Sequence, residues 1–143
     1  MSFQYNDGGR LAAGFHGTAG DCVVRAIAIA SGLGYQVVYD DINRLAQNER
    51  GAKKSNARNG VFTGKRWFKD YLIGLGWRWT PTMQIGSGCK VHLRADELPA
   101  GTLIVAVSKH MVAVIDGTIH DLYDPSRNGT RCVYGYWSKG GAS

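Results

Sequence analysis

The chain has 143 residues, 44% of them hydrophobic, and a formal net charge of +6. This length predicts one domain that can bury a core without disulfides or metal ions. A run of about 18 apolar residues, which would indicate a transmembrane helix, is absent from the sequence, and the N-terminus has no basic region followed by an apolar stretch. We therefore expect a cytoplasmic protein that has no export signal and does not bind membranes.

The N-terminal half shows helical periodicity. The first ten residues are polar and contain two glycines, so residues 1–15 are expected to form an arm. Residues 22–31 are apolar on nearly every side, which predicts a helix buried in the middle of the domain, with Gly32 as its C-terminal cap. The pattern from residue 35 to residue 48 is amphipathic and predicts a second helix, and Thr63 can cap a third.

A basic segment separates the second and third predicted helices. Residues 49–60 contain two glycines and no hydrophobic periodicity, which predicts a flexible loop. Part of the positive charge is concentrated here and at Lys65-Arg66. Such a patch can face nucleic acid, an acidic protein or an acidic nucleotide. For a charge of this size we favour the simpler interpretation, a solvated loop that keeps the protein soluble.

The C-terminal half changes to short β runs. They are predicted at residues 77–80, 90–93, 102–107, 110–115, 118–123 and 131–136. Asp116-Gly117 lies between two of these runs and is a strong hairpin signal. A helical half followed by an antiparallel sheet half gives an α+β fold class within a single domain.

Cys22 lies at the start of the predicted 22–31 helix, just after Gly20. The unpaired N–H groups and the positive end of the helix dipole favour a thiolate at this position. The alternative is a buried free cysteine that packs as a small hydrophobe. Cys22, Cys89 and Cys132 are an odd number of cysteines at wide spacing. This pattern fits reduced thiols better than a disulfide framework.

The other two cysteines give only weak support for a metal site. Cys89 and His92 offer two ligands at short spacing, but a structural zinc site needs a second close pair. His120 and Cys132 are too loosely spaced to supply it. We therefore predict neither a metal nor another cofactor.

The predicted sheet supplies a histidine and an acid. His110 opens the 110–115 strand, and its partner depends on the register of the hairpin that follows. With a three-residue loop, His110 lies opposite Asp124. With a two-residue loop it faces Tyr123, and Asp121 becomes its diagonal neighbour on the same face. We choose Asp124, because it lies at the strand end beside the expected cleft.

A cysteine at the start of a central helix and a histidine on a strand of the following sheet resemble the papain-like cysteine peptidases. In papain-type enzymes a glutamine and a glycine precede the catalytic cysteine at spacings that His16, Gly17 and Cys22 reproduce. His110-Met-Val-Ala-Val followed by Asp124-Pro125 is similar to the bacteriocin-processing double-glycine peptidases, a branch of the same superfamily. The chain also resembles small proteins encoded in phage and prophage genomes.

The resemblance implies a papain-like domain with a Cys-His-Asp triad. Cys22 would attack a carbonyl, His110 would protonate the leaving group, and Asp124 would orient the imidazole. The N–H of Cys22 and the side chain of His16 would form the oxyanion hole. The chain departs from the papain pattern, because it has His16 in place of glutamine, Val23 in place of an aromatic residue and aspartate in place of asparagine.

The function implied is a cysteine-dependent hydrolase of amide, isopeptide or thioester bonds, foremost a peptidase. A deamidase or an acyltransferase would use the same thioester intermediate. The partner would be a protein or peptide substrate, a host protein in the host cytoplasm if the chain is phage-encoded. The alternative is a non-catalytic basic binding module of phage origin that blocks a host protein or binds nucleic acid. The basic loop and the Trp77-Arg78-Trp79 stretch would serve that module.

Overall fold

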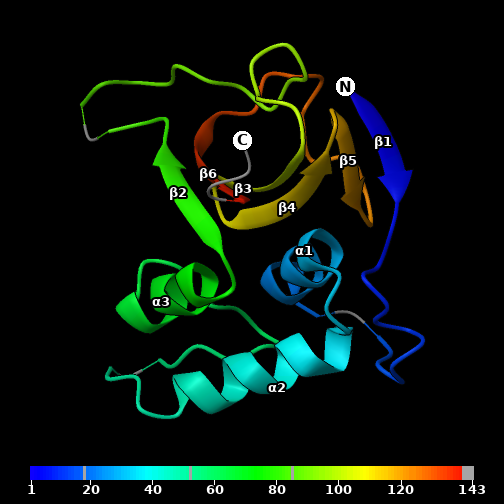
Figure 1. Ribbon diagram of the computed structural model, residues 1–143, viewed down its shortest axis with the longest axis vertical. Coiled ribbons are helices and arrows are strands. Elements are labelled where there is room, and N and C mark those ends of the chain that lie inside the picture. The colour runs from blue at the N-terminus through cyan, green and yellow to red at the C-terminus, as the bar shows by residue number, and fades with distance from the viewer. Residues whose placement is uncertain (18, 52, 85, 140–143) are drawn as a thin grey trace.

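A computed structural model describes residues 1–17, 19–51, 53–84 and 86–139 and has an α+β fold (Figure 1). Its helices in the described residues are α1 (Cys22–Ser31), α2 (Tyr35–Ala46) and α3 (Arg66–Gly74). Its strands there are β1 (Ser2–Tyr5), β2 (Trp77–Pro81), β3 (Thr102–Val107), β4 (His110–Ile115), β5 (Thr118–Asp121) and β6 (Val133–Lys139). The predicted order, helices first and most of the sheet afterwards, is confirmed.

The strands form one mixed sheet in the order β1-β5-β4-β3-β6-β2. Strands β5, β4, β3, β6 and β2 pair antiparallel, whereas β1 pairs parallel to β5, with Phe3 beside Ile119. The expected N-terminal arm therefore contains an edge strand, and the sheet is not purely antiparallel. This strand was not predicted from the sequence: Phe3 and Tyr5 alternate with Ser2 and Gln4, but the run has only four residues and all of them are exposed.

The sheet is covered on both faces. Helix α1 lies between the sheet and α2, with α3 beside them (Figure 1), and its fully buried Val24 and Ile27 belong to the same apolar cluster as Ile104 of the sheet. On the other face, Leu93 and Leu98 of the long connection between β2 and β3 pack with strand residues such as Val112. Burial on all sides explains why α1 carries almost no polar residue.

Three local expectations differ from the structure. Residues 90–93 and 131–136 do not form two strands; they contribute one isolated bridge between His92 and Cys132, and β6 starts at Val133. Helix α3 starts at Arg66 with Lys65 as its N-cap, so Thr63 does not cap it. Helix α2 ends at Ala46, two residues before the predicted limit.

The 49–60 segment has internal anchors. It lacks the periodicity of a helix or strand, as expected, but the side chains of Glu49, Ser55 and Ala57 are buried. Glu49 accepts hydrogen bonds from Ser55 N and Trp67 Nε1, at 3.0 and 2.9 Å. Ala57 N donates to Asn43 Oδ1 at 2.8 Å. These contacts hold the segment against α2 and α3. Its flexibility stays a prediction.

Candidate active site

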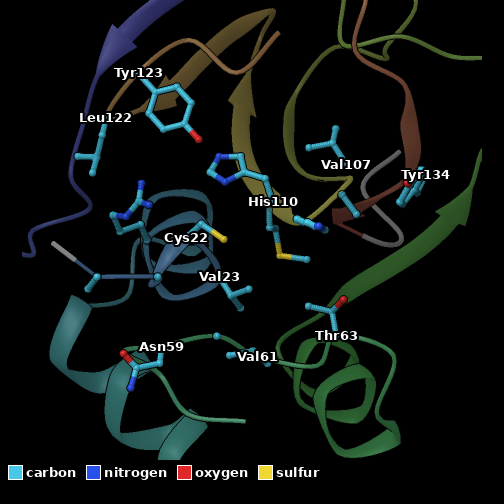
Figure 2. A pocket seen from close by; sticks show the side chains of 17 residues that line it. Cys22, Val23, Asn59, Val61, Thr63, Val107, His110, Leu122, Tyr123 and Tyr134 are labelled. Carbon is cyan, nitrogen blue, oxygen red and sulfur yellow. The ribbon is translucent and has the colours of Figure 1, made fainter. Parts of the chain in front are cut away.

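Cys22 lies at the mouth of a cleft between the helices and the sheet (Figure 2). As the first residue of α1 it occupies the helix end where backbone N–H groups have no intrahelical acceptor and the dipole is positive. The half-buried side chain faces a cleft of about 630 Å³. Among the residues that line this cleft are Asn59, Val61, Thr63, His110, Tyr123 and Tyr134.

His110 stands directly above Cys22 in Figure 2, close enough for its imidazole to lower the pKa of the Cys22 thiol. The other end of the imidazole, Nε2, lies 2.7 Å from Oδ2 of Asp121. Because Nε2 faces the carboxylate, Nδ1 is the nitrogen available to the sulfur atom. The side chains of His110 and Asp121 retain only 7% and 2% of their exposure, so water competes little for these bonds. The structure thus brings a thiol, an imidazole and a carboxylate together beside the cleft.

Asp121, and not Asp124, is the partner of His110. Strands β4 and β5 pair with Ile115 beside Thr118, so the hairpin has the two-residue loop Asp116-Gly117. Both loop residues have positive φ, 47° and 78°, as a two-residue hairpin turn of the primed kind requires. In this register His110 and Asp121 are diagonal neighbours on one face. The carboxylate of Asp124 instead accepts a hydrogen bond from Ser126 N at 2.9 Å, which closes a turn.

A buried arginine holds the carboxylate from its other side. Arg25 Nη1 lies 2.6 Å from Oδ1 of Asp121, and Arg25 Nε lies 3.0 Å from Oδ1 of Asp21. Asp21 also accepts a hydrogen bond from the Tyr35 hydroxyl at 2.6 Å and forms an ion pair with Arg10. Each oxygen of Asp121 therefore has a cationic or hydrogen-bonding partner, and its orientation toward His110 is fixed.

The contacts shift the protonation equilibria toward an ion pair. Burial alone raises the pKa of the Cys22 thiol, but the hydrogen bond to His110 and the charge of that imidazole outweigh it and lower the pKa. Burial lowers the pKa of His110, yet its bonds to Asp121 and Cys22 raise it to about 9. The pKa of the Asp121 carboxyl is lowered against its burial, mainly by His110. The arrangement stabilises the thiolate, the imidazolium and the carboxylate relative to their neutral forms.

His16 is not where the predicted oxyanion hole requires it. Its side chain is exposed and is not among the residues that line the cleft. Arg10 Nη2 binds the carbonyl oxygens of His16 and Gly17, at 3.1 and 2.6 Å, and so ties this stretch of backbone to the N-terminal segment. The spacing of six residues before Cys22 therefore does not bring the imidazole over the sulfur, and residue 16 has no part in the mechanism proposed below.

Cys89 and Cys132 form a disulfide, which corrects the expectation of three reduced thiols. It connects residues 43 apart in the chain and ties the β2–β3 connection to the start of β6. In the described part of the chain, Cys22 is the free cysteine. No group of three His, Cys, Asp or Glu residues is placed to hold a metal ion within that part.

Sequence reasoning missed the two residues behind the triad, Arg25 and Asp21. A signal was present, because Arg25 interrupts the apolar 22–31 run of a helix expected to be buried on all sides. A charged side chain in such a helix needs a buried partner of opposite charge. That requirement points to an acid in the core, although the sequence alone does not say which one.

Comparison of the chain with protein-family models, curated proteins and solved structures finds no match. In the described residues, none of the helices is long and apolar enough to cross a membrane.

Proposed function

We propose that this protein is a cysteine-dependent hydrolase of amide bonds, with polypeptides as its substrates and a papain-like domain as its scaffold. One observation carries the proposal: His110 lies between the Cys22 thiol and the Asp121 carboxylate beside an open cleft. A nucleophile, a base and a group that orients the base are the parts that nucleophilic catalysis needs, in the order that it needs them.

In the proposed reaction the Cys22 thiolate attacks the carbonyl carbon and forms a C–S bond, and the carbonyl electrons move to oxygen. The backbone N–H of Cys22, at the positive end of α1, would donate a hydrogen bond to that developing charge. The tetrahedral intermediate collapses as the C–N bond breaks, and His110 gives the Nδ1 proton to the departing amine. A thioester on Cys22 remains.

Water then completes the reaction. Neutral His110 takes a proton from a water molecule, whose oxygen attacks the thioester carbonyl. The C–S bond breaks, the carboxylic acid leaves, and the thiolate–imidazolium pair is restored. Asp121 stays deprotonated in every step. It holds the ring and stabilises the imidazolium, while Arg25 holds Asp121.

The shape of the cleft supports a substrate with side chains. A smaller hollow of about 210 Å³ adjoins it, and the two share the lining residues Thr63, Ala106, Met111 and Tyr134. Trp79 and Trp137 form an aromatic wall of this hollow, with ring centroids 5.2 Å apart. An apolar side chain next to the scissile bond would fit there. Isopeptides, thioesters and carboxamides remain alternative substrates with the same intermediate.

The test is labelling by an activity-based electrophile at neutral pH, followed by peptide mapping. The proposal requires that Cys22 is modified quickly and stoichiometrically in the folded protein, and that His110→Ala slows this modification to the rate of an ordinary thiol. Slow labelling of folded wild-type protein, at the rate of an ordinary buried thiol, would show that the cleft only binds. That result would favour the alternative, a basic binding module.

The cytoplasmic location stays a prediction, and it loses the support of the cysteine pattern. Disulfides persist in oxidising compartments and are rare in a reducing cytosol. The Cys89–Cys132 bond is therefore easier to reconcile with an oxidising environment. A link to phage genomes likewise rests on the sequence resemblance alone.

A further inference from the structure

The cleft at Cys22 continues into a basic groove on the helical side. Asn59, Gly60 and Val61 line both the cleft and a neighbouring hollow of about 390 Å³ that contains Lys53 and Lys54. Asn59 and Val61 lie across from Tyr123 in Figure 2. A second hollow adjoins the first at Lys53 and Phe62. We name the two hollows together the basic groove; its defining side chains are Arg50, Lys53, Lys54, Phe62 and Lys65.

The defining cations of this groove form no ion pairs in the described residues, although the charge of Lys65 contributes to the lowered pKa of Glu49. Between residues 50 and 66 the sequence has six Lys and Arg residues and no Asp or Glu. Glu49, just before them, is buried and already bound to Ser55 N and Trp67 Nε1. Of the ion pairs in the described residues, none involves Arg50, Lys53, Lys54 or Lys65. Potential from such a cluster reaches about 10 Å at moderate salt, and so extends over the adjoining cleft.

The cleft itself adds to the same sign of charge. Exposed Lys109 lines it beside His110. Among the described residues that line the cleft and the basic groove, none is an Asp or a Glu. Phe62, 46% exposed, offers the groove an apolar contact as well. A ligand that crosses from the triad to the groove therefore meets cations and an aromatic ring.

We propose that the substrate is a polypeptide with an acidic stretch next to the scissile bond, and that this stretch lies in the basic groove. The proposal rests on the proposed function, because the thiol cleft supplies the reason to choose a polypeptide over another polyanion. A peptide carries an attackable carbonyl and carboxylates on one chain, whereas a nucleic acid carries only the charge. The basic segment would then select substrates by charge complementarity.

The experiment compares two peptidyl chloromethyl ketones of one sequence, in which four flanking residues are all Glu or all Gln. The rate of Cys22 modification is measured by intact-mass spectrometry. We expect the Glu peptide to react about tenfold faster at low salt. Each exposed ion pair should raise the rate about two- to threefold, and three such pairs together give about that ratio. The ratio should approach one at about 1 M salt, where the Debye length is about 3 Å.

Charge reversal identifies the groove. Lys53→Glu with Lys54→Glu should remove the preference for the Glu peptide, whereas Lys90→Gln, an exposed cation on the β2–β3 connection, should leave it intact. Equal rates for the two peptides with wild-type protein, with rapid labelling of Cys22, would overturn the acidic specificity and leave the hydrolase proposal standing. The salt dependence of the rate ratio in the wild type tests the acidic specificity without any variant.

Binding of non-electrophilic fluorescent versions of the peptides to Cys22→Ser, measured by anisotropy, separates the two proposals. Tight, salt-sensitive binding of the Glu peptide without any labelling of wild-type protein would support the groove and overturn the hydrolase. Displacement of the Glu peptide by a single-stranded oligonucleotide at much lower concentration than by unlabelled Glu peptide would overturn the polypeptide as occupant. It would indicate a nucleic-acid groove instead.

Discussion

Asp121 binds His110 across a diagonal of the β4–β5 hairpin, with Oδ2 2.7 Å from Nε2, and both side chains are almost fully buried. The diagonal geometry lets one carboxylate reach the imidazole with one oxygen and Arg25 with the other. The hairpin thereby brings a β-strand residue, a helix residue and the histidine into one rigid unit behind the thiol. Rigidity of this kind keeps a general base oriented during a reaction.

The first prediction compares two aspartates of the same hairpin end. Asp121→Asn removes the charge that stabilises the imidazolium, so the fraction of Cys22 present as thiolate at pH 6 to 7 should fall. Alkylation of Cys22 by iodoacetamide at that pH should slow by about tenfold, the effect of roughly one pKa unit. Asp124→Asn is the matched control and should label like the wild type, because Asp124 only closes a turn. If Asp124→Asn slowed alkylation more than Asp121→Asn, Asp124 would be the residue that orients His110.

Most of the fold, but only part of the site, could be predicted from the sequence. The three helices and the central strands follow from periodicity, and Cys22 and His110 follow from their places at the starts of a helix and a strand. The choice between Asp121 and Asp124 depended on one residue of loop length, because a single-residue slip changes which side chains share a face. The glycine in Asp116-Gly117 is compatible with both loops, and the wrong one was preferred.

Long-range pairing was beyond the sequence for a different reason. Cys89 and Cys132 lie 43 residues apart, and three cysteines at wide spacing do not show which two can meet. Likewise the parallel β1–β5 pairing depends on where the rest of the sheet leaves an open edge. His16 shows the opposite error. Its spacing before Cys22 matched the motif, but the backbone around it does not bring its side chain to the cleft.

The second prediction concerns pH. The pKa of Cys22 is lowered and that of His110 is raised to about 9, so both shifts favour a thiolate–imidazolium pair. Alkylation of Cys22 near pH 6 should thus be faster than that of an ordinary thiol, whose pKa of about 8.5 leaves it protonated there. Hydrolysis of an amide also needs the imidazolium proton for the leaving amine. Turnover should accordingly fall as the pH rises through about 9, while alkylation should not.

His110→Ala provides the control for this profile. Without the imidazole, the labelling rate should follow a single titration near the pKa of a normal thiol, and activity toward amides should be lost at every pH. Stopped-flow alkylation across pH 5 to 10 measures both proteins under the same conditions. Identical profiles for the two proteins would mean that His110 does not set the protonation state of Cys22.

The third prediction concerns the stability of the buried network. Arg25→Gln leaves the carboxylates of Asp21 and Asp121 without their shared cation, and breaking a buried ion pair typically costs about 3–5 kcal/mol in the free energy of unfolding. The control is Arg44→Gln, which breaks an ion pair with Asp41 in which the arginine side chain is 65% exposed. It should cost no more than about 1 kcal/mol. Urea unfolding at neutral pH measures both.

The pH dependence of that loss has a definite sign. The pKa of Asp121 is lowered in the folded state, with His110 as the main lowering partner and Arg25 contributing. The stability that Asp121 contributes is present above its unfolded pKa of about 3.9 and is lost as the pH falls through the folded pKa. The difference in the free energy of unfolding between the wild type and Arg25→Gln should therefore become smaller at acidic pH. A difference that is constant from neutral pH to below pH 3 would show that lost packing, not lost charge, destabilises the variant.

The fourth prediction is a thiol count. Native protein kept without reductant should present one free thiol, Cys22, to a thiol reagent under denaturing conditions, and Cys22→Ser should present none. Cys89→Ser with Cys132→Ser should lower the free energy of unfolding by about 2–4 kcal/mol, the usual effect of removing a disulfide. The rate of Cys22 alkylation in this double variant should match the wild type. Three free thiols in the native preparation would contradict the disulfide.

The last prediction concerns the anchors of the basic segment. Glu49 holds it to Ser55 and Trp67 from a buried position, and Ser55 Oγ in turn accepts a hydrogen bond from Phe62 N at 2.8 Å. Trypsin should therefore cut native protein first at exposed Arg50, Lys53 or Lys54 and more slowly at Arg58, whose neighbour Ala57 is buried and bonded to α2.

Glu49→Ala should remove this difference in cleavage rate between the trypsin sites. With the carboxylate gone, Ser55 N and Trp67 Nε1 lose their acceptor, and cleavage at Arg58 should become about as fast as at Lys53 or Lys54. Labelling of Cys22 by the Glu peptide electrophile should slow with it, since Asn59 and Val61 line the cleft and depend on the same anchors. Small neutral iodoacetamide, which needs no groove, should still react at the wild-type rate. Equal slowing of both reagents would instead show that the loop supports the triad itself.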